Sequence, residues 1–192
     1  MATSAVEICN LALALLGEAG IVSLAQANSE PARLCNLNYA AVRDELLRAQ
    51  PWNFALTRRS LPRLAAAPTF GFRNAFALPS EPFCLRAVRL WAGAGWSGDF
   101  RIEGRDLLAD CDQADLLYIA RIEVPALFDP IFVQCLAHRL AQRVAYPLTR
   151  NRDLTRRLGF DADRLMAEAA AVDGVETVVD PLPASPLVAI RG

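Results

Sequence analysis

Two helix-forming segments with clear start and stop signals fill the first 55 residues, and they constrain the fold more than any other feature. In the first segment, Ser4 and Glu7 have the spacing of a capping box, in which each side chain accepts a hydrogen bond from the other residue's backbone amide. Gly17 lies where a left-handed C-terminal cap is expected. Apolar residues recur between these signals at helical spacing, at Ile8, Leu11, Ala12 and Leu15. The pattern predicts one short amphipathic helix.

The second segment begins at Ser29-Glu30-Pro31, which supplies a capping hydroxyl, an acid for the positive helix end and a proline tolerated in the first turn. The chain from Leu34 to Ala49 has a helical pattern, and Pro51 ends it. Both segments consist of packing and capping residues. They predict architecture, and we find no catalytic pattern in them.

Several short pieces of the sequence have the order and spacing of a known family. Most of them lie before Ala55, namely Ile8-Cys9-Asn10-Leu11-Ala12-Leu13, Leu16-Gly17-Glu18, Arg33-Leu34-Cys35-Asn36, and Arg43-Asp44 followed by Trp52-Asn53-Phe54. In these pieces the chain resembles the tail tubular protein A family, the head-to-tail adaptors of short-tailed, double-stranded DNA phages. The similarity continues more loosely through Leu78-Pro79, Ile102-Glu103-Gly104 and the helix after Pro130.

The resemblance implies a structural virion protein with no enzymatic activity. Such a protein forms a ring, of twelve copies by analogy, that docks beneath the portal and presents its lower surface to the tail nozzle protein. DNA passes through the central channel without sequence-specific binding, and the ring belongs to the tail or neck of a virion assembled in the host cytoplasm.

The composition suits one compact domain, or a helical body with a small inserted module, in a chain of 192 residues. Hydrophobic residues make up 54% and charged residues 21%, which supplies a sizeable core and argues against wholesale disorder. The apolar run from Leu11 to Leu16 is far too short to span a bilayer, and no basic stretch precedes it. We therefore expect neither a membrane span nor a secretory signal.

The formal charge is −1, from 20 basic and 21 acidic residues, and every basic residue is an arginine. Codon bias in a GC-rich genome explains this usage, and the planar guanidinium also suits ion pairs across subunit interfaces. The two explanations are compatible. Because nucleic-acid affinity comes mainly from counterion release by basic side chains, the charge balance argues against a protein that grips DNA. It suits a conduit through which DNA slides.

The cysteines and the single histidine do not form a recognisable reactive pattern. The five cysteines (Cys9, Cys35, Cys84, Cys111 and Cys135) have no metal-binding spacing, which favours packing roles in a reducing compartment. His138 follows Cys135 by three positions, but a cysteine–histidine nucleophile pair also needs a cleft and an orienting third group. We expect no catalytic residue, no cofactor and no metal ligand.

Residues 56–124 have strand-like patterns and predict an antiparallel β module, a meander of four or five strands, inserted between helices. The run from Cys84 to Trp91 is one strand, and Leu116, Tyr118, Ala120 and Ile122 share one face of the last strand. A glycine-rich turn between them carries Trp96, which we expect to lie at a loop tip that faces outward or towards tail components.

Helical patterns return in residues 125–174, starting at Asp129-Pro130 and running to Pro147, then from about Asp153 to Val172. The whole pattern predicts an α+β fold with a helical body of about four helices. The last helix carries the candidate subunit-interface residues Arg152, Arg156, Arg157, Asp161 and Arg164. An equal alternative is that these residues only form a solvent-exposed face of the helix.

Residues 175–192 contain three prolines and predict an extended C-terminal arm. Its apolar residues, Leu182, Leu187, Val188 and Ile190, either fold back on the chain's own core or insert into a partner. We favour the partner, since extended arms commonly pair with another chain's sheet edge or groove. By analogy that partner is the portal.

Two other functions fit parts of the sequence. One is a head-completion connector of a long-tailed phage. The other is a soluble nucleic-acid-binding or regulatory module, favoured by the local cluster of Arg150, Arg152, Arg156 and Arg157. A cytosolic enzyme fits least, because paired acid–base groups are missing.

Overall fold

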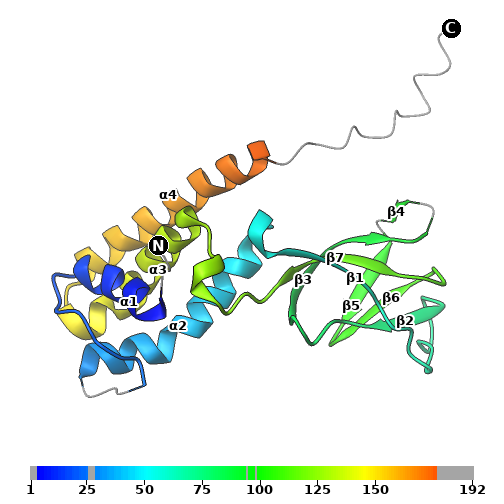
Figure 1. The fold of residues 1–192 in the computed structure, drawn as a ribbon, viewed down its shortest axis with the longest axis horizontal. Helices are drawn as coiled ribbons and strands as arrows, with labels where there is room; N and C mark the ends of the chain where they lie inside the picture. The colour runs from blue at the N-terminus through cyan, green and yellow to red at the C-terminus, as the bar shows by residue number, and fades with distance from the viewer. Residues whose placement is uncertain (1–3, 26–28, 94, 98, 177–192) are drawn as a thin grey trace, which may run out of the picture.

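The computed structural model describes residues 4–25, 29–93, 95–97 and 99–176. These residues form four α-helices, two short 3-10 helices and seven strands. The helices gather in a body at one end of the molecule and the strands form a module at the other (Figure 1). The predicted α+β class, with a helical body and antiparallel β structure, is confirmed.

The first two helices begin where their caps predict. α1 (Ala5–Ala14) has both hydrogen bonds of the capping box, from the Glu7 amide to Ser4 Oγ at 3.1 Å and from the Ser4 amide to Glu7 Oε2 at 2.7 Å. Gly17 after this helix has a φ of 73°, a conformation that favours glycine. The second helix, α2 (Glu30–Ala49), is capped by the Ser29 hydroxyl, which accepts from the Ala32 amide at 3.4 Å.

The later helices are longer than predicted. α3 (Pro130–Thr149) is capped by Asp129, continues two residues past Pro147 and ends at Arg150, whose φ is 54°. The last helix, α4 (Arg152–Glu176), passes through Gly174 and ends two residues inside the segment predicted as an arm. The predicted end at Val172 was therefore wrong. A glycine costs a helix only about 1 kcal/mol, whereas the first proline that forbids helix comes at Pro181.

α3 is the centre of the helical body and contacts α1, α2 and α4. An apolar stripe at helical spacing on this helix is completely buried, at Phe132, Leu136, Leu140 and Val144. α2 and α4 lie on opposite sides of it (Figure 1). The outer faces of these two helices are therefore the two broad sides of the body.

An aromatic cluster fills the core where the chain leaves α2. Trp52 caps the short helix η1 (Asn53–Ala55) and Phe54 lies within it. Both pack against Phe132, with ring centroids 5.1 and 5.2 Å from it. Phe128, just after η2 (Pro125–Leu127), lies 5.0 Å from the same ring. The Trp52 indole donates to the Leu46 carbonyl at 2.9 Å, which satisfies its buried N–H. The Trp-Asn-Phe piece of the sequence is thus a packing element.

The strands form two antiparallel sheets. The first contains β1 (Leu56–Ser60), β7 (Asp115–Ala120), β3 (Cys84–Trp91) and β4 (Trp96–Ser97), in that order. The second contains β2 (Asn74–Ala77), β6 (Asp106–Ala109) and β5 (Phe100–Glu103). The predicted meander of four or five strands was wrong. Pairing of β1 with β7 joins the first and last strands, a long-range contact that no local pattern encodes.

The last strand connects the two cores. Leu116, Tyr118 and Ala120 pack with the half-buried Ile122 in the β core, so the predicted face is confirmed. Ile119 points to the other side and belongs to the core of the helical body. The buried side chains of β7 therefore contribute to both the core of the β module and the core of the helical body.

Arginines join the helical body to the β module. Arg43 on α2 is buried, and its guanidinium lies 2.8 Å from Asp44 Oδ1 and 3.5 Å from Glu123 Oε1. Arg121 approaches the other Asp44 oxygen at 2.8 Å. The guanidinium of Arg121 also lies over the Phe83 ring, 4.4 Å from its centroid. Asp44 thus binds one arginine from the helical body and one from the end of the β module. These contacts fix the position of the two parts relative to each other.

Candidate interaction surfaces

The candidate interface residues on α4 are surface residues that are mostly engaged along their own helix. Arg156 pairs with Asp153 at 3.5 Å, and Arg164 pairs with Asp161 at 3.9 Å and with Glu168 at 3.1 Å. Exposed pairs of this kind contribute little to stability, typically below about 1 kcal/mol. These side chains are therefore free to exchange partners at small cost when another surface approaches.

The structure adds an apolar residue to this face that the sequence analysis missed. Phe160 lies among the arginines and is 69% exposed. Arg157, one turn before it, has no ion pair or hydrogen bond with the residues that the structure describes. Arg152 stacks over Tyr146, with its guanidinium 5.7 Å from the ring centroid. We define the α4 face as Arg152, Arg156, Arg157, Phe160 and Arg164.

The opposite side of the helical body also exposes large apolar side chains. On α2, Leu37 is 70% exposed, and it follows the Glu30–Arg33 ion pair. On α1, Leu11 and Leu15 are partly exposed. We define the α2 face as Glu30, Arg33, Leu37 and Ala41, which share one side of the helix at spacings of three and four residues. No sequence pattern distinguished Leu37 from a core residue.

The two sides differ in charge. Residues 4–41 contain three acidic residues and one arginine, a net charge of −2. Residues 150–164 contain five arginines and three aspartates, a net charge of +2. The first part of the α4 side and the α1–α2 side therefore carry net charges of opposite sign, whereas residues 165–176 of α4 add three acidic residues.

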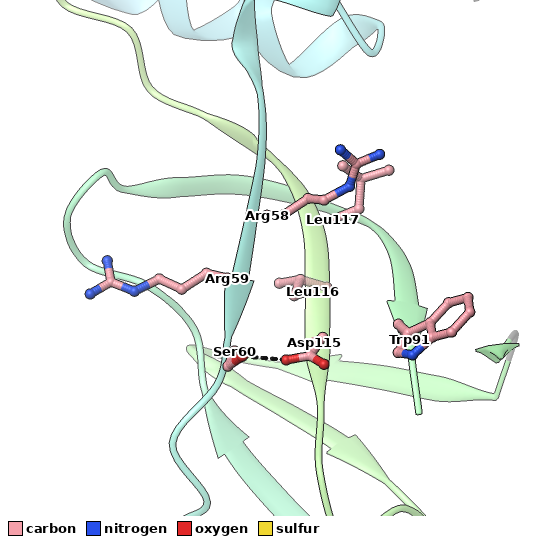
Figure 2. Close-up of a pocket in the computed structure, with 7 residues that line it drawn as sticks. All are labelled: Arg58, Arg59, Ser60, Trp91, Asp115, Leu116 and Leu117. Atoms are coloured by element: carbon pink, nitrogen blue, oxygen red, sulfur yellow. Dashed lines mark hydrogen bonds between the residues drawn. The ribbon is translucent and has the colours of Figure 1, made fainter. Parts of the chain in front are cut away.

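The first sheet has an open outer face with a shallow depression of about 390 Å³ (Figure 2). Register places Ser60, Asp115 and Trp91 in one row across the three strands. The Ser60 hydroxyl donates to the Asp115 carboxylate, and the Trp91 indole lies at one side of the depression (Figure 2). Arg59 points away from Trp91 and donates to the Glu81 carbonyl. The Asp115 carboxylate is thus already occupied, which leaves a flat surface suited to protein contacts.

The remaining candidate residues are placed only in part. The backbone of Trp96 lies in β4 and pairs with Trp91, so it belongs to the hairpin that ends β3. The side chain of Trp96 lies outside the described residues. So do the arm residues Leu182, Leu187, Val188 and Ile190.

The Cys135–His138 pair lacks the geometry of a nucleophile and its base. Cys135 is completely buried, and desolvation raises the pKa of its thiol to about 11. His138 Nδ1 lies 2.9 Å from the backbone carbonyl oxygen of Gln134, one turn earlier. Both residues serve the packing and local bonding of α3.

Within residues 4–25, 29–93, 95–97 and 99–176, no cluster of three or more His, Cys, Asp or Glu side chains is placed to hold a metal ion. None of the helices described there has the length and apolar character needed to cross a membrane.

No protein-family model matches the chain, and no curated protein matches it.

Proposed function

We propose that this protein is a structural head-to-tail adaptor of a phage virion. Copies of the chain form a ring, of twelve members by analogy, between the portal and the tail nozzle protein. The proposal is supported by the resemblance in residues 1–55 and by the exposed faces of the helical body. The observation that carries it is the pair of unlike, complementary faces on opposite sides of that body.

Unlike faces favour a head-to-tail contact between copies. Phe160 is at the centre of the α4 face and Leu37 is at the centre of the α2 face. A surface that pairs with a different surface of the next copy gives a heterologous interface, which produces a closed ring when the rotation between copies closes. The net charges of +2 on residues 150–164 and −2 on residues 4–41 favour this arrangement over contacts between like faces.

The rest of the molecule fits the same role. The β module projects from the helical body, so it is free to meet tail components when the bodies form a ring (Figure 1). The formal charge of −1 suits a channel through which DNA slides, because tight binding needs many phosphate contacts from basic residues. Under this proposal the arm residues Leu182, Leu187, Val188 and Ile190 contact the portal.

Imaging with portal rings tests the proposal. The protein is mixed with purified portal rings from a short-tailed phage, and negative-stain images are scored for added annular density. We expect a ring on one face of the portal for the wild-type chain and none for Phe160→Asp. Phe70→Asp is the matched control, because Phe70 is 87% exposed but lies in the β module. Absence of density with the wild-type chain contradicts the proposal.

A second candidate is a soluble nucleic-acid-binding module. The observation that favours it is the concentration of Arg150, Arg152, Arg156 and Arg157 around the turn between α3 and α4. A gel shift of labelled duplex DNA distinguishes the two functions. A shift that weakens steeply with salt, and that is lost in Arg156→Gln/Arg157→Gln, favours this module over the adaptor.

A further inference from the structure

An apolar groove of about 370 Å³ lies between the start of α3 and the last turns of α4. Ile131 contributes from α3, and Leu165 and Val172 contribute from α4. Val172 is an aliphatic residue that is 48% exposed. Glu168 adds one carboxylate to this lining. The groove is distinct from the α4 face, because its residues point towards α3.

The chain that follows α4 starts beside this groove. α4 ends at Glu176, four residues after Val172, which corresponds to about 6 Å along a helix. Ten residues, 177–186, then precede Leu187. An extended segment of that length reaches about 33 Å, which is ample for a return to the groove.

Residues 187–191 match the groove in chemistry. Leu187-Val188-Ala189-Ile190 is a continuous apolar run, and Arg191 follows it directly. Arg191 is the single basic residue after Arg164 in the sequence. The groove offers aliphatic side chains and the Glu168 carboxylate. Glu168 lies 3.1 Å from Arg164 in an exposed ion pair, which another cation can replace at small cost. Both the apolar run and the charge therefore have a counterpart.

We propose that residues 187–191 fold back into the α3–α4 groove of their own chain. Leu187 and Ile190 pack against the aliphatic lining, and Arg191 pairs with Glu168. The covalent connection favours the chain's own segment, because a segment joined by a short linker has an effective concentration of about 1 mM, far above that of separate copies at micromolar concentration. The inference does not rest on the adaptor role. In an adaptor, release from the groove precedes any contact of this segment with a portal.

Hydrogen exchange of the full-length chain is the first test. The wild-type chain is compared with Leu187→Ser/Ile190→Ser, and Leu182→Ser/Ala184→Ser is the matched control, because both of its residues lie before the segment 187–191. We expect the apolar double variant to raise the exchange rates of amides in residues 165–172 by about tenfold. A rise of this size results when a segment whose bound state is populated about ten times more than its free state no longer binds. The amides of α2 and the control variant should not change. Unchanged exchange in residues 165–172 overturns the proposal.

A synthetic peptide of residues 181–192 is the second test. We expect this peptide to bind Leu187→Ser/Ile190→Ser about tenfold more tightly than the wild-type chain, whose groove is already occupied. Val172→Asp in the double variant should abolish binding. Equal binding to both chains, or binding to neither, overturns the proposal.

Protein concentration separates the chain's own segment from that of a second copy. Occupation within one chain gives exchange protection that is independent of concentration. Protection that increases with concentration assigns the segment to a neighbouring copy and also overturns the proposal.

Discussion

At the scale of single residues, the Asn10 side chain holds the backbone of Ile21 through two hydrogen bonds. Its Nδ2 donates to the Ile21 carbonyl at 3.0 Å, and its Oδ1 accepts from the Ile21 amide at 2.7 Å. Gly20 next to it is close-packed, since an added Cβ would lie 3.2 Å from Asn10 Oδ1. Asn10 is part of a sequence piece that carries the family resemblance, and its role here is to hold the loop after α1.

Asn10→Ala should destabilise the protein by about 1–3 kcal/mol, because both backbone groups of Ile21 lose their partner in a partly buried place. Urea unfolding followed by circular dichroism measures the change. Asn36→Ala is the matched control, because Asn36 is exposed on α2 and alanine favours helix there. Similar unfolding midpoints for the two variants would contradict a stabilising role of the Asn10–Ile21 hydrogen bonds.

Buried thiols make the stability depend on pH. Burial raises the pKa of Cys135 from 9.0 to about 11, so the folded state retains a proton that the unfolded state loses. This contribution is complete below pH 9 and is lost as pH rises towards 11. At pH 10 the loss from this thiol is on the order of 1 kcal/mol.

Denaturant unfolding at pH 7.5 and pH 10 tests this linkage. We expect the wild-type chain to lose stability at pH 10 and Cys135→Ala to lose on the order of 1 kcal/mol less between the two conditions. An identical loss in both proteins would exclude Cys135 as the titrating group.

At the scale of elements, Asp44 is the residue through which α2 holds the end of β7. Its two carboxylate oxygens each lie 2.8 Å from an arginine, Arg43 in the body and Arg121 after the strand. Arg43 is nearly inaccessible, with 8% of its side chain exposed, so its charge depends on this partner. The joint between the two parts is therefore polar and specific in its geometry.

Asp44→Asn should destabilise the protein by about 3 kcal/mol, because it leaves the buried Arg43 guanidinium with only the exposed Glu123 carboxylate, 3.5 Å away. Glu30→Gln is the matched control, since its pair with Arg33 is exposed and 3.8 Å long, and its loss should cost less than about 1 kcal/mol. Thermal and urea unfolding of both variants measure the difference. Equal effects would mean that the joint does not depend on this charge.

At the scale of the whole molecule, α2 and α4 lie on opposite sides of the helical body (Figure 1), and they carry the exposed Leu37 and Phe160, respectively. α3 separates these sides, so one copy cannot bring its own two faces together. Under the proposed adaptor function, each copy offers one face to each neighbour. The β module stays outside this contact, since its strands lie at the far end of the molecule (Figure 1).

Mixing two variants tests the head-to-tail contact. Phe160→Asp retains an intact α2 face, and Leu37→Asp retains an intact α4 face. Under conditions in which the wild-type chain forms rings, we expect each variant alone to sediment as a monomer and an equimolar mixture to form dimers that do not grow. A mixture that remains monomeric would contradict a heterologous interface. Amine-reactive cross-linkers are unsuitable, because the chain contains no lysine.

The sequence by itself determined the helix starts, the β3 strand and the α+β class, because these depend on residues three or four positions apart. Ser4 with Glu7 and Ser29 with Ala32 are local contacts, and the structure contains both. Only the tertiary structure decided that β1 pairs with β7, that Arg43 is buried and that Leu37 and Phe160 are exposed. These properties arise where distant segments compete for the same core, so the periodicity of one segment cannot report them.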